Sequence, residues 1–166
     1  MKKLFVAVIM LTCLAACEKP IPELPAETQT GKNTFGCLVN GELVIPYNMN
    51  GYGSRAQYDR TSERLQITGH GQNYQVFQLT VDRPEVNRPA PINNVVYRIP
   101  KNITSYYYGG TNLGEITFTR FDSEIVSGTF RFIGYKHYTS PVESVDLDDF
   151  VTVTMGRFDV IMDIIN

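Results

Sequence analysis

The chain has 166 residues and a formal net charge of −2, which is enough length for one domain with its own hydrophobic core. Lysine and arginine are not clustered anywhere, which argues against a nucleic acid partner and against electrostatic binding to anionic lipid. The 10 tyrosines, 9 phenylalanines and 13 glycines, with no tryptophan, favour β-structure.

Residues 1–16 are typical of a bacterial export signal. A cationic start, Met1-Lys2-Lys3, precedes the apolar run LFVAVIMLTCLAA, which is shorter than the roughly 20 residues of a membrane-spanning helix. The next stretch, Leu14-Ala15-Ala16-Cys17, resembles the lipobox of bacterial lipoproteins. That resemblance implies removal of residues 1–16 and attachment of a diacylglyceryl group and a fatty acyl chain such as palmitate at Cys17, whose thiol is the nucleophile.

Residues 17–33 form a predicted spacer between the lipid and the domain. Pro20, Pro22 and Pro25 hold such a segment extended, so it would reach roughly 50 Å at most. Beyond it, Cys37 is the one side-chain thiol expected in the mature chain, which excludes an intramolecular disulfide. We expect Cys37 to be a small buried hydrophobic residue.

Residues 34–166 read as a single β-domain. Asn40-Gly41 in TFGCLVNGELVIPY lies between two apolar runs and predicts a hairpin with Leu38 opposite Leu43. Residues 48–62 are a looser stretch with room for a helical turn. RLQITGH and YQVFQLTVD alternate and predict a second hairpin, the proline-rich residues 82–94 predict a loop, and VVYRI predicts a short strand.

The second half of the chain holds the most regular alternation. EITFTRFDSEIVSGTFRFIGY predicts a hairpin that turns at Asp122-Ser123-Glu124, and Gly128 marks a bulge or a close approach of two backbones. FVTVTMGRFDVIMDII predicts one long strand or two strands separated at Gly156. In total we expect an all-β fold of about eight or nine strands, an antiparallel β-sandwich or a partly open barrel.

Several of these stretches resemble an uncharacterised family of Bacteroidota lipoproteins, a domain of unknown function. The segments that carry the resemblance are TQTGKNTFGCLVNGE after the lipobox, ITFTRFDSEIVSGTFRF and the closing VTMGRFDV. The resemblance implies a compact all-β domain of the cell envelope. It implies no activity, no cofactor and no catalytic residue.

Few residues have the spacing that chemistry would require. His70 and His137 are the two histidines, neither has a second histidine at metal spacing, and we expect both in solvated loops. The segment SVDLDDF predicts an acidic loop, in which Asp146, Asp148 and Asp149 are weak candidates for a hard cation such as calcium. Solvated carboxylates are the competing interpretation.

Tyr106, Tyr107 and Tyr108 are the candidate binding residues. In an extended segment Tyr106 and Tyr108 point one way and Tyr107 points the other. Tyrosine combines a large flat contact area with a polar tip, which suits a sugar ring or a partner protein. Tyrosines that simply flank a β-core are the alternative.

Three functions stay open from the sequence. The first is a non-enzymatic, lipid-anchored binding module for a protein or glycan, held at the outer membrane with undetermined orientation. The second is a structural or accessory subunit of an outer-membrane assembly that pairs through exposed strand edges. The third and weakest is a glycan-active enzyme with a carboxylate pair, for which the candidates are Asp122, Glu124, Asp148 and Asp149.

Overall fold

The computed structural model describes residues 23–47, 53–99, 105–138 and 144–165 and is almost entirely β-structure. The signal segment 1–16 and the predicted lipidation residue Cys17 lie outside the described residues. The one helical element in the described part is a single 3₁₀ turn, η2 (Gln72–Tyr74). The eleven strands are β1 (Thr34–Val39), β2 (Glu42–Val44), β3 (Arg55–Asp59), β4 (Arg64–His70), β5 (Val76–Asp82), β6 (Pro89–Pro91), β7 (Asn94–Arg98), β8 (Ser105–Gly110), β9 (Gly114–Phe121), β10 (Ile125–Tyr138) and β11 (Ser144–Ile165).

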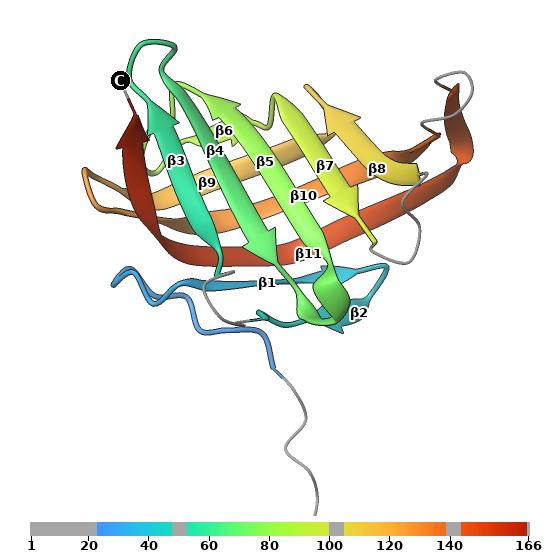
Figure 1. Cartoon of the computed structure of the whole chain (residues 1–166), viewed down its shortest axis with the longest axis horizontal. Coiled ribbons are helices and arrows are strands. Elements are labelled where there is room, and N and C mark those ends of the chain that lie inside the picture. Colours follow the sequence, from blue (N-terminus) through green and yellow to red (C-terminus); the bar gives the residue numbers. More distant parts are fainter. Residues whose placement is uncertain (1–22, 48–52, 100–104, 139–143, 166) are drawn as a thin grey trace, which may run out of the picture.

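The strands form one hydrogen-bonded sheet that folds over into two layers (Figure 1). The front layer is β3-β4-β5-β7-β8, and the long strands β9, β10 and β11 cross behind it. The last residues of β10 pair with β8, and Met162–Ile165 of β11 pair in parallel with β3. The two longest strands therefore join both edges of the front layer to the back layer, which is a sandwich-like arrangement.

The all-β prediction is confirmed, with eleven strands in place of the expected eight or nine. Strand β6 was not predicted, because its three residues are too few to show alternation and lie within the predicted proline loop. It forms one outer edge of the sheet, and the three-residue strand β2 of the predicted first hairpin forms the other. An edge tolerates Pro89 and Pro91 because its outer side needs no N–H donors.

The core lies between the two layers and is rich in aromatic rings. Phe35 of β1 packs with its ring centroid 5.2 Å from that of Phe77 and 5.1 Å from that of Phe130. Tyr97 of β7 continues this stack, 4.6 Å from Phe77. Since these rings come from both layers, their burial, worth about 2–3 kcal/mol per large side chain, holds the layers together.

The three predicted hairpins are present, and the first has the predicted register. Asn40 and Gly41 have φ values of 50° and 82°, the left-handed conformations that a two-residue hairpin turn requires, and Leu38 lies opposite Leu43. Cys37 lies fully buried opposite Val44. β4 pairs with β5 and β9 with β10, both as predicted.

Two segments differ from the prediction. Within the stretch expected to be loose, residues 55–59 form β3, because their backbone pairs with β4 on one side and with the end of β11 on the other. The expected acidic loop 144–150 is the first part of β11, which continues without a break past Gly156. It pairs with the end of β10, where a register shift leaves three residues of β11 unpaired between Asp146 and Phe150.

The part of the predicted spacer that the structure describes lies against the domain. Residues 23–33 form no strand, but the carbonyl of Pro25 accepts a hydrogen bond from Arg157, 3.1 Å away, and the Pro25 ring covers Gly36. Residues 28–32 bind Asp159 of β11. This contact leaves only the residues before Pro25 for the predicted extended linker.

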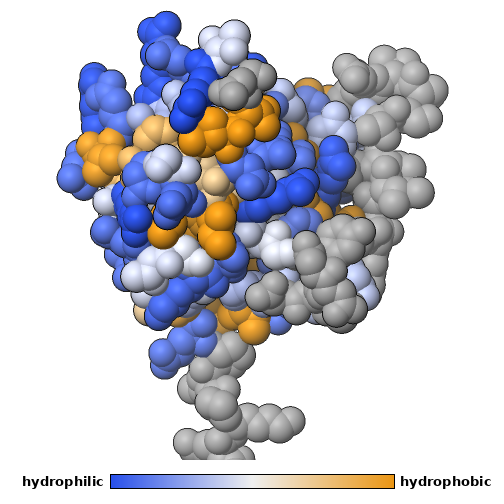
Figure 2. Space-filling view, turned by 60° about the vertical axis from the view of Figure 1, so that its left-hand side comes forward, coloured by the Kyte–Doolittle hydropathy of each residue, from blue (hydrophilic) through white to orange (hydrophobic). Residues whose placement is uncertain are grey.

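The surface where β11 ends beside β3 is largely hydrophilic. Figure 2 shows this side with several separate apolar areas between blue ones. Single apolar side chains scattered over a surface are normal where that surface faces solvent. The aromatic residues considered next come from the opposite end of β11.

Candidate binding face

Strand β8 places its three tyrosines on opposite sides of the sheet, as the alternation predicts. Tyr107 points inward and packs against the core, with its ring centroid 5.9 Å from that of Tyr97. Tyr106 and Tyr108 lie on the outer surface. In β10, His137 is paired with Tyr106 and Tyr135 with Tyr108, so all four outer side chains share one face.

The outer rings contact one another across the strands. The ring centroid of His137 lies 5.9 Å from that of Tyr106, with the two rings within 12° of parallel, and 5.1 Å from that of Tyr108. The ring centroid of Tyr135 lies 6.1 Å from that of Phe150 in β11. We call Tyr106, Tyr108, Tyr135, His137 and Phe150 the aromatic face; Phe150 is 50% exposed and Tyr108 is 36% exposed.

Beneath the aromatic face, a polar cluster links β8, β10 and β11. The hydroxyl of Tyr107 donates to Oδ1 of Asp149 at 3.0 Å, and the ammonium of Lys136 donates to Oδ2 at 2.5 Å. The bond from Lys136 lowers the pKa of Asp149. Burial, followed by the hydrogen bond to Asp149, raises the pKa of Tyr107. The cluster fixes the three strands whose other side carries the rings.

This cluster brings together two residues, Tyr107 and Asp149, that the sequence analysis had singled out for separate reasons. Tyr107 was a binding candidate and Asp149 a cation candidate, and both oxygens of Asp149 are occupied by protein donors. Asp146 accepts the backbone N–H bonds of Asp148 and Asp149. Among the described residues, no group of three or more His, Cys, Asp or Glu side chains is placed to hold a metal ion.

The residues of the aromatic face that sequence reasoning missed are Tyr135, His137 and Phe150. His137 was expected in a solvated loop, but both histidines lie in strands, His70 at the end of β4 and His137 within β10. Alternation of Tyr135 and His137 in GYKHY places both on the side away from Lys136. That pattern was visible, but their neighbours depend on the pairing of β10 with β8 and β11.

A hollow continues from the aromatic face along β10. It has a volume of about 690 Å³ and lies on the outer side of β9, β10 and β11. Ile133, two residues before Tyr135, lines it together with Thr152 and an ion pair in which Arg131 lies 3.2 Å from Glu115. Aromatic rings and a hollow of mixed polar and apolar lining are therefore adjacent on one surface.

The four carboxylates considered for hydrolysis lie in two groups, one at each end of β10. Asp122 and Glu124 lie in the turn before Ile125, at the start of β10, whereas Asp149 contacts Lys136 near its end. Eleven residues of strand separate these points by on the order of 30 Å. A carboxylate from one group and a carboxylate from the other are therefore farther apart than the roughly 10 Å of a glycosidase pair.

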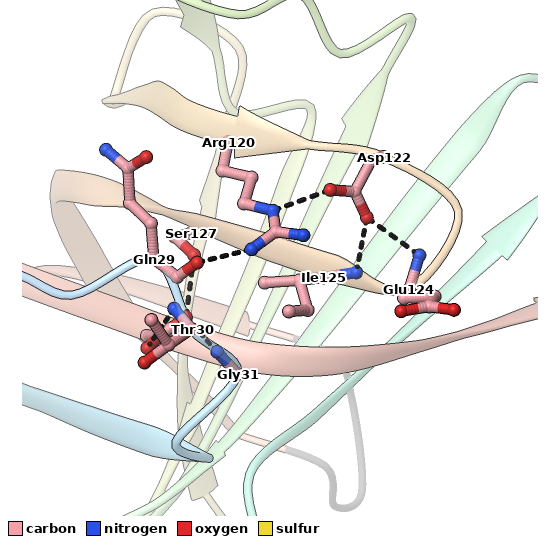
Figure 3. A network of polar contacts seen from close by, with 9 residues as sticks. Gln29, Thr30, Gly31, Arg120, Asp122, Glu124, Ile125 and Ser127 are labelled. Atoms are coloured by element: carbon pink, nitrogen blue, oxygen red, sulfur yellow. Dashed lines mark hydrogen bonds and ion pairs between the residues drawn. The ribbon is translucent and has the colours of Figure 1, made fainter.

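A second polar cluster holds the N-terminal segment. Arg120 of β9 donates to Asp122 and to the carbonyl of Gln29, and Asp122 also accepts the N–H groups of Glu124 and Ile125 (Figure 3). These bonds lower the pKa of Asp122 to about 2, the backbone bonds contributing most. The cluster joins the β9–β10 turn to the segment before β1.

Comparison of the chain with protein-family models, with curated proteins and with solved structures gave no match. Within the described residues, no helix has the length and apolarity to cross a membrane.

Proposed function

We propose that the chain is a lipid-anchored protein of the cell envelope whose aromatic face binds a glycan, without catalysis. The observation that carries the proposal is the convergence of five rings from β8, β10 and β11 beside a hollow that includes charged and hydroxyl side chains. Ring faces pack against the C–H surfaces of sugars, and the hollow offers charged and hydroxyl side chains for sugar hydroxyls.

The composition of the face favours a glycan over a protein partner. Tyr106, Tyr108, Tyr135 and His137 each combine a ring with a polar edge, whereas protein interfaces also need a contiguous desolvated centre. Pairing through strand edges, as in an accessory subunit, is less favoured. The outer edges of the described sheet are three-residue strands, and β6 has proline at two of its three positions.

Glycan binding is tested with the full-length protein in detergent on a glycan array. We expect binding that falls at least about fivefold in Tyr106→Ala and in Tyr108→Ala, because each ring of the face contributes of the order of 1 kcal/mol or more. Tyr74→Ala, which removes a 62% exposed tyrosine outside the face, is the matched control. Absence of binding to every glycan on the array, or binding that Tyr106→Ala and Tyr108→Ala both retain, would contradict the proposal. A protein partner would then be the better hypothesis.

Lipid attachment rests on the sequence motif and is tested separately. Metabolic labelling with a palmitate analogue is expected to mark the wild type and the Cys13→Ser variant but not Cys17→Ser. The proposed location is the outer membrane of a bacterium of the Bacteroidota, as the resemblance to that lipoprotein family implies. A Cys17→Ser protein that is still labelled and processed would overturn the anchor and leave the glycan proposal standing.

A further inference from the structure

A second hollow lies beyond the first on the outer side of β9, β10 and β11. Its volume is about 310 Å³, and Glu115 and Arg131 line both hollows, so the two are continuous. Thr129, two residues before Arg131 in β10, lines the second hollow. Since alternate residues of a strand share one side, the outward side chains of β10 run from His137 of the aromatic face through the first hollow to Thr129. We call the aromatic face and the two hollows together the groove.

The groove is long, and the N-terminal segment closes one end of it. From Thr129 to His137, β10 runs for about 27 Å, because each residue of a strand adds about 3.4 Å. Just before Thr129, Ser127 is fully buried and donates to Asp159, the carboxylate that also binds residues 28–32. The segment before β1 therefore covers the outer side of β10 at this point, and the groove ends there.

A β-bulge lies where the two hollows meet. The register of β10 against β11 shifts at Arg131, which faces two consecutive residues, Thr154 and Met155. As a result, Thr154 lines the first hollow and Met155 the second. Met155 has a φ of 52°, a left-handed conformation that is uncommon for residues other than glycine and asparagine, and it is 55% exposed. A strained residue with an exposed apolar side chain adds nothing to the core, which favours a role in binding.

The charges along the groove are balanced. Of the described residues that line the two hollows, the charged ones are two arginines and two glutamates. Arg131 lies 3.2 Å from Glu115, and Arg157 lies 3.3 Å from Glu27 of the N-terminal segment. Each guanidinium has further N–H donors, and each carboxylate has further acceptor positions, for the hydroxyl groups of a ligand. Donors and acceptors without net charge suit a neutral ligand better than an acidic or a basic one.

Building on the proposed glycan function, on which this inference rests, we propose that the groove binds an unbranched, neutral oligosaccharide of several sugar units. A chain fits because the groove follows one strand over a length that a single sugar ring does not fill. Sugars at one end pack on the aromatic face. Those at the other end bond to the paired arginines and glutamates, and the side chain of Met155 packs against the C–H surface of a ring.

The test measures the affinity of the full-length protein in detergent by isothermal titration calorimetry. The probes are ladders, from the monosaccharide to the hexasaccharide, of β-1,4-linked glucose, xylose and mannose and of α-1,4-linked glucose. At least one ladder is expected to bind. Its affinity should rise at least about tenfold from the disaccharide to the hexasaccharide, because a longer chain reaches from the aromatic face into the second hollow.

Two variants address the end of the groove away from the aromatic face. Met155→Gly and Arg131→Ala should each weaken hexasaccharide binding at least about fivefold and leave disaccharide binding within about twofold of the wild type. Glycine adopts positive φ without strain, so the melting temperature of Met155→Gly should not fall, and its loss of binding cannot come from misfolding. Arg83→Ala, which removes an exposed arginine paired with Glu63 outside the groove, is the matched control.

The outcomes separate this proposal from the proposed function. The long groove is overturned if no ladder binds, if affinity does not rise with chain length, or if Met155→Gly and Arg131→Ala both bind the hexasaccharide as the wild type does. Binding that is independent of length but is lowered by Tyr108→Ala would overturn the long groove and leave the glycan function standing. Absence of binding to the ladders and to the glycan array would overturn both.

Discussion

At the scale of single residues, Asp159 is the best-satisfied buried charge of the described chain. Its carboxylate is 1% exposed and accepts the hydroxyls of Thr28 at 2.6 Å and Ser127 at 2.7 Å. It also accepts the N–H groups of Thr30, Gly31 and Lys32. Burial alone would raise the pKa of Asp159, but these bonds outweigh burial and lower it to about 2.

Asp159→Asn should destabilise the fold by roughly 2 kcal/mol or more. The amide NH₂ would face donors where the carboxylate offers an acceptor, and each bond to the charge is worth about 1.5–3 kcal/mol. Urea unfolding followed by circular dichroism measures the change. Asp163→Asn, at an exposed position of the same strand, should shift the free energy of unfolding by less than about 0.5 kcal/mol; equal effects of the two substitutions would contradict this role for Asp159.

The same carboxylate predicts a pH dependence. Its pKa is about 2 in the folded state against 3.8 for an ordinary aspartate, so its contribution to stability is complete above about pH 4 and is lost as the pH falls towards 2. The expected loss is roughly 2 kcal/mol in the free energy of unfolding. Measured from pH 5 to pH 2, Asp159→Asn should show a correspondingly smaller decline than the wild type. Parallel curves for the two proteins would refute the assignment.

At the scale of elements, β9 and β10 approach closely where their register shifts beside Gly128. A Cβ atom at Gly128 would lie 2.2 Å from the carbonyl oxygen of Thr117 and 3.1 Å from Cα of Phe118. Both neighbours are backbone atoms, so they cannot move without disturbing the pairing. The predicted bulge or close approach at Gly128 is therefore confirmed.

Gly128→Ala is expected to cost about 3 kcal/mol, because overpacking forces the two strands apart. Gly110→Ala is the matched control, since a Cβ atom there meets only the Asn93 oxygen at 3.8 Å. Thermal unfolding should show a clear loss in melting temperature for Gly128→Ala and little change for Gly110→Ala. A Gly128→Ala protein as stable as the control would be incompatible with the close approach.

At the scale of the whole molecule, β10 and β11 tie both layers to one continuous core. Cys37 is fully buried in that core, and burial raises the pKa of its thiol to about 12. Reagents that attack thiolates can therefore reach it only when the sandwich opens.

In a chain with Cys13 and Cys17 replaced by serine, labelling of Cys37 should be negligible in the native state at pH 8. Its dependence on urea should follow that of global unfolding, because no smaller opening exposes a residue packed between both layers. A maleimide time course read by mass spectrometry measures this. The labelling rate of the unfolded chain in strong denaturant is the control, and rapid native labelling would show that the first hairpin opens on its own.

The sequence by itself determined the strands of the three predicted hairpins, the Asn40-Gly41 turn and the alternation that points Tyr107 away from Tyr106 and Tyr108. These features follow from alternation and turn chemistry over a few residues. Only the tertiary structure placed His137 between Tyr106 and Tyr108, Asp149 against Tyr107, and Thr28 on Asp159, 131 positions away along the chain. Such contacts depend on strand order and register between distant segments, and a local pattern carries no information on either.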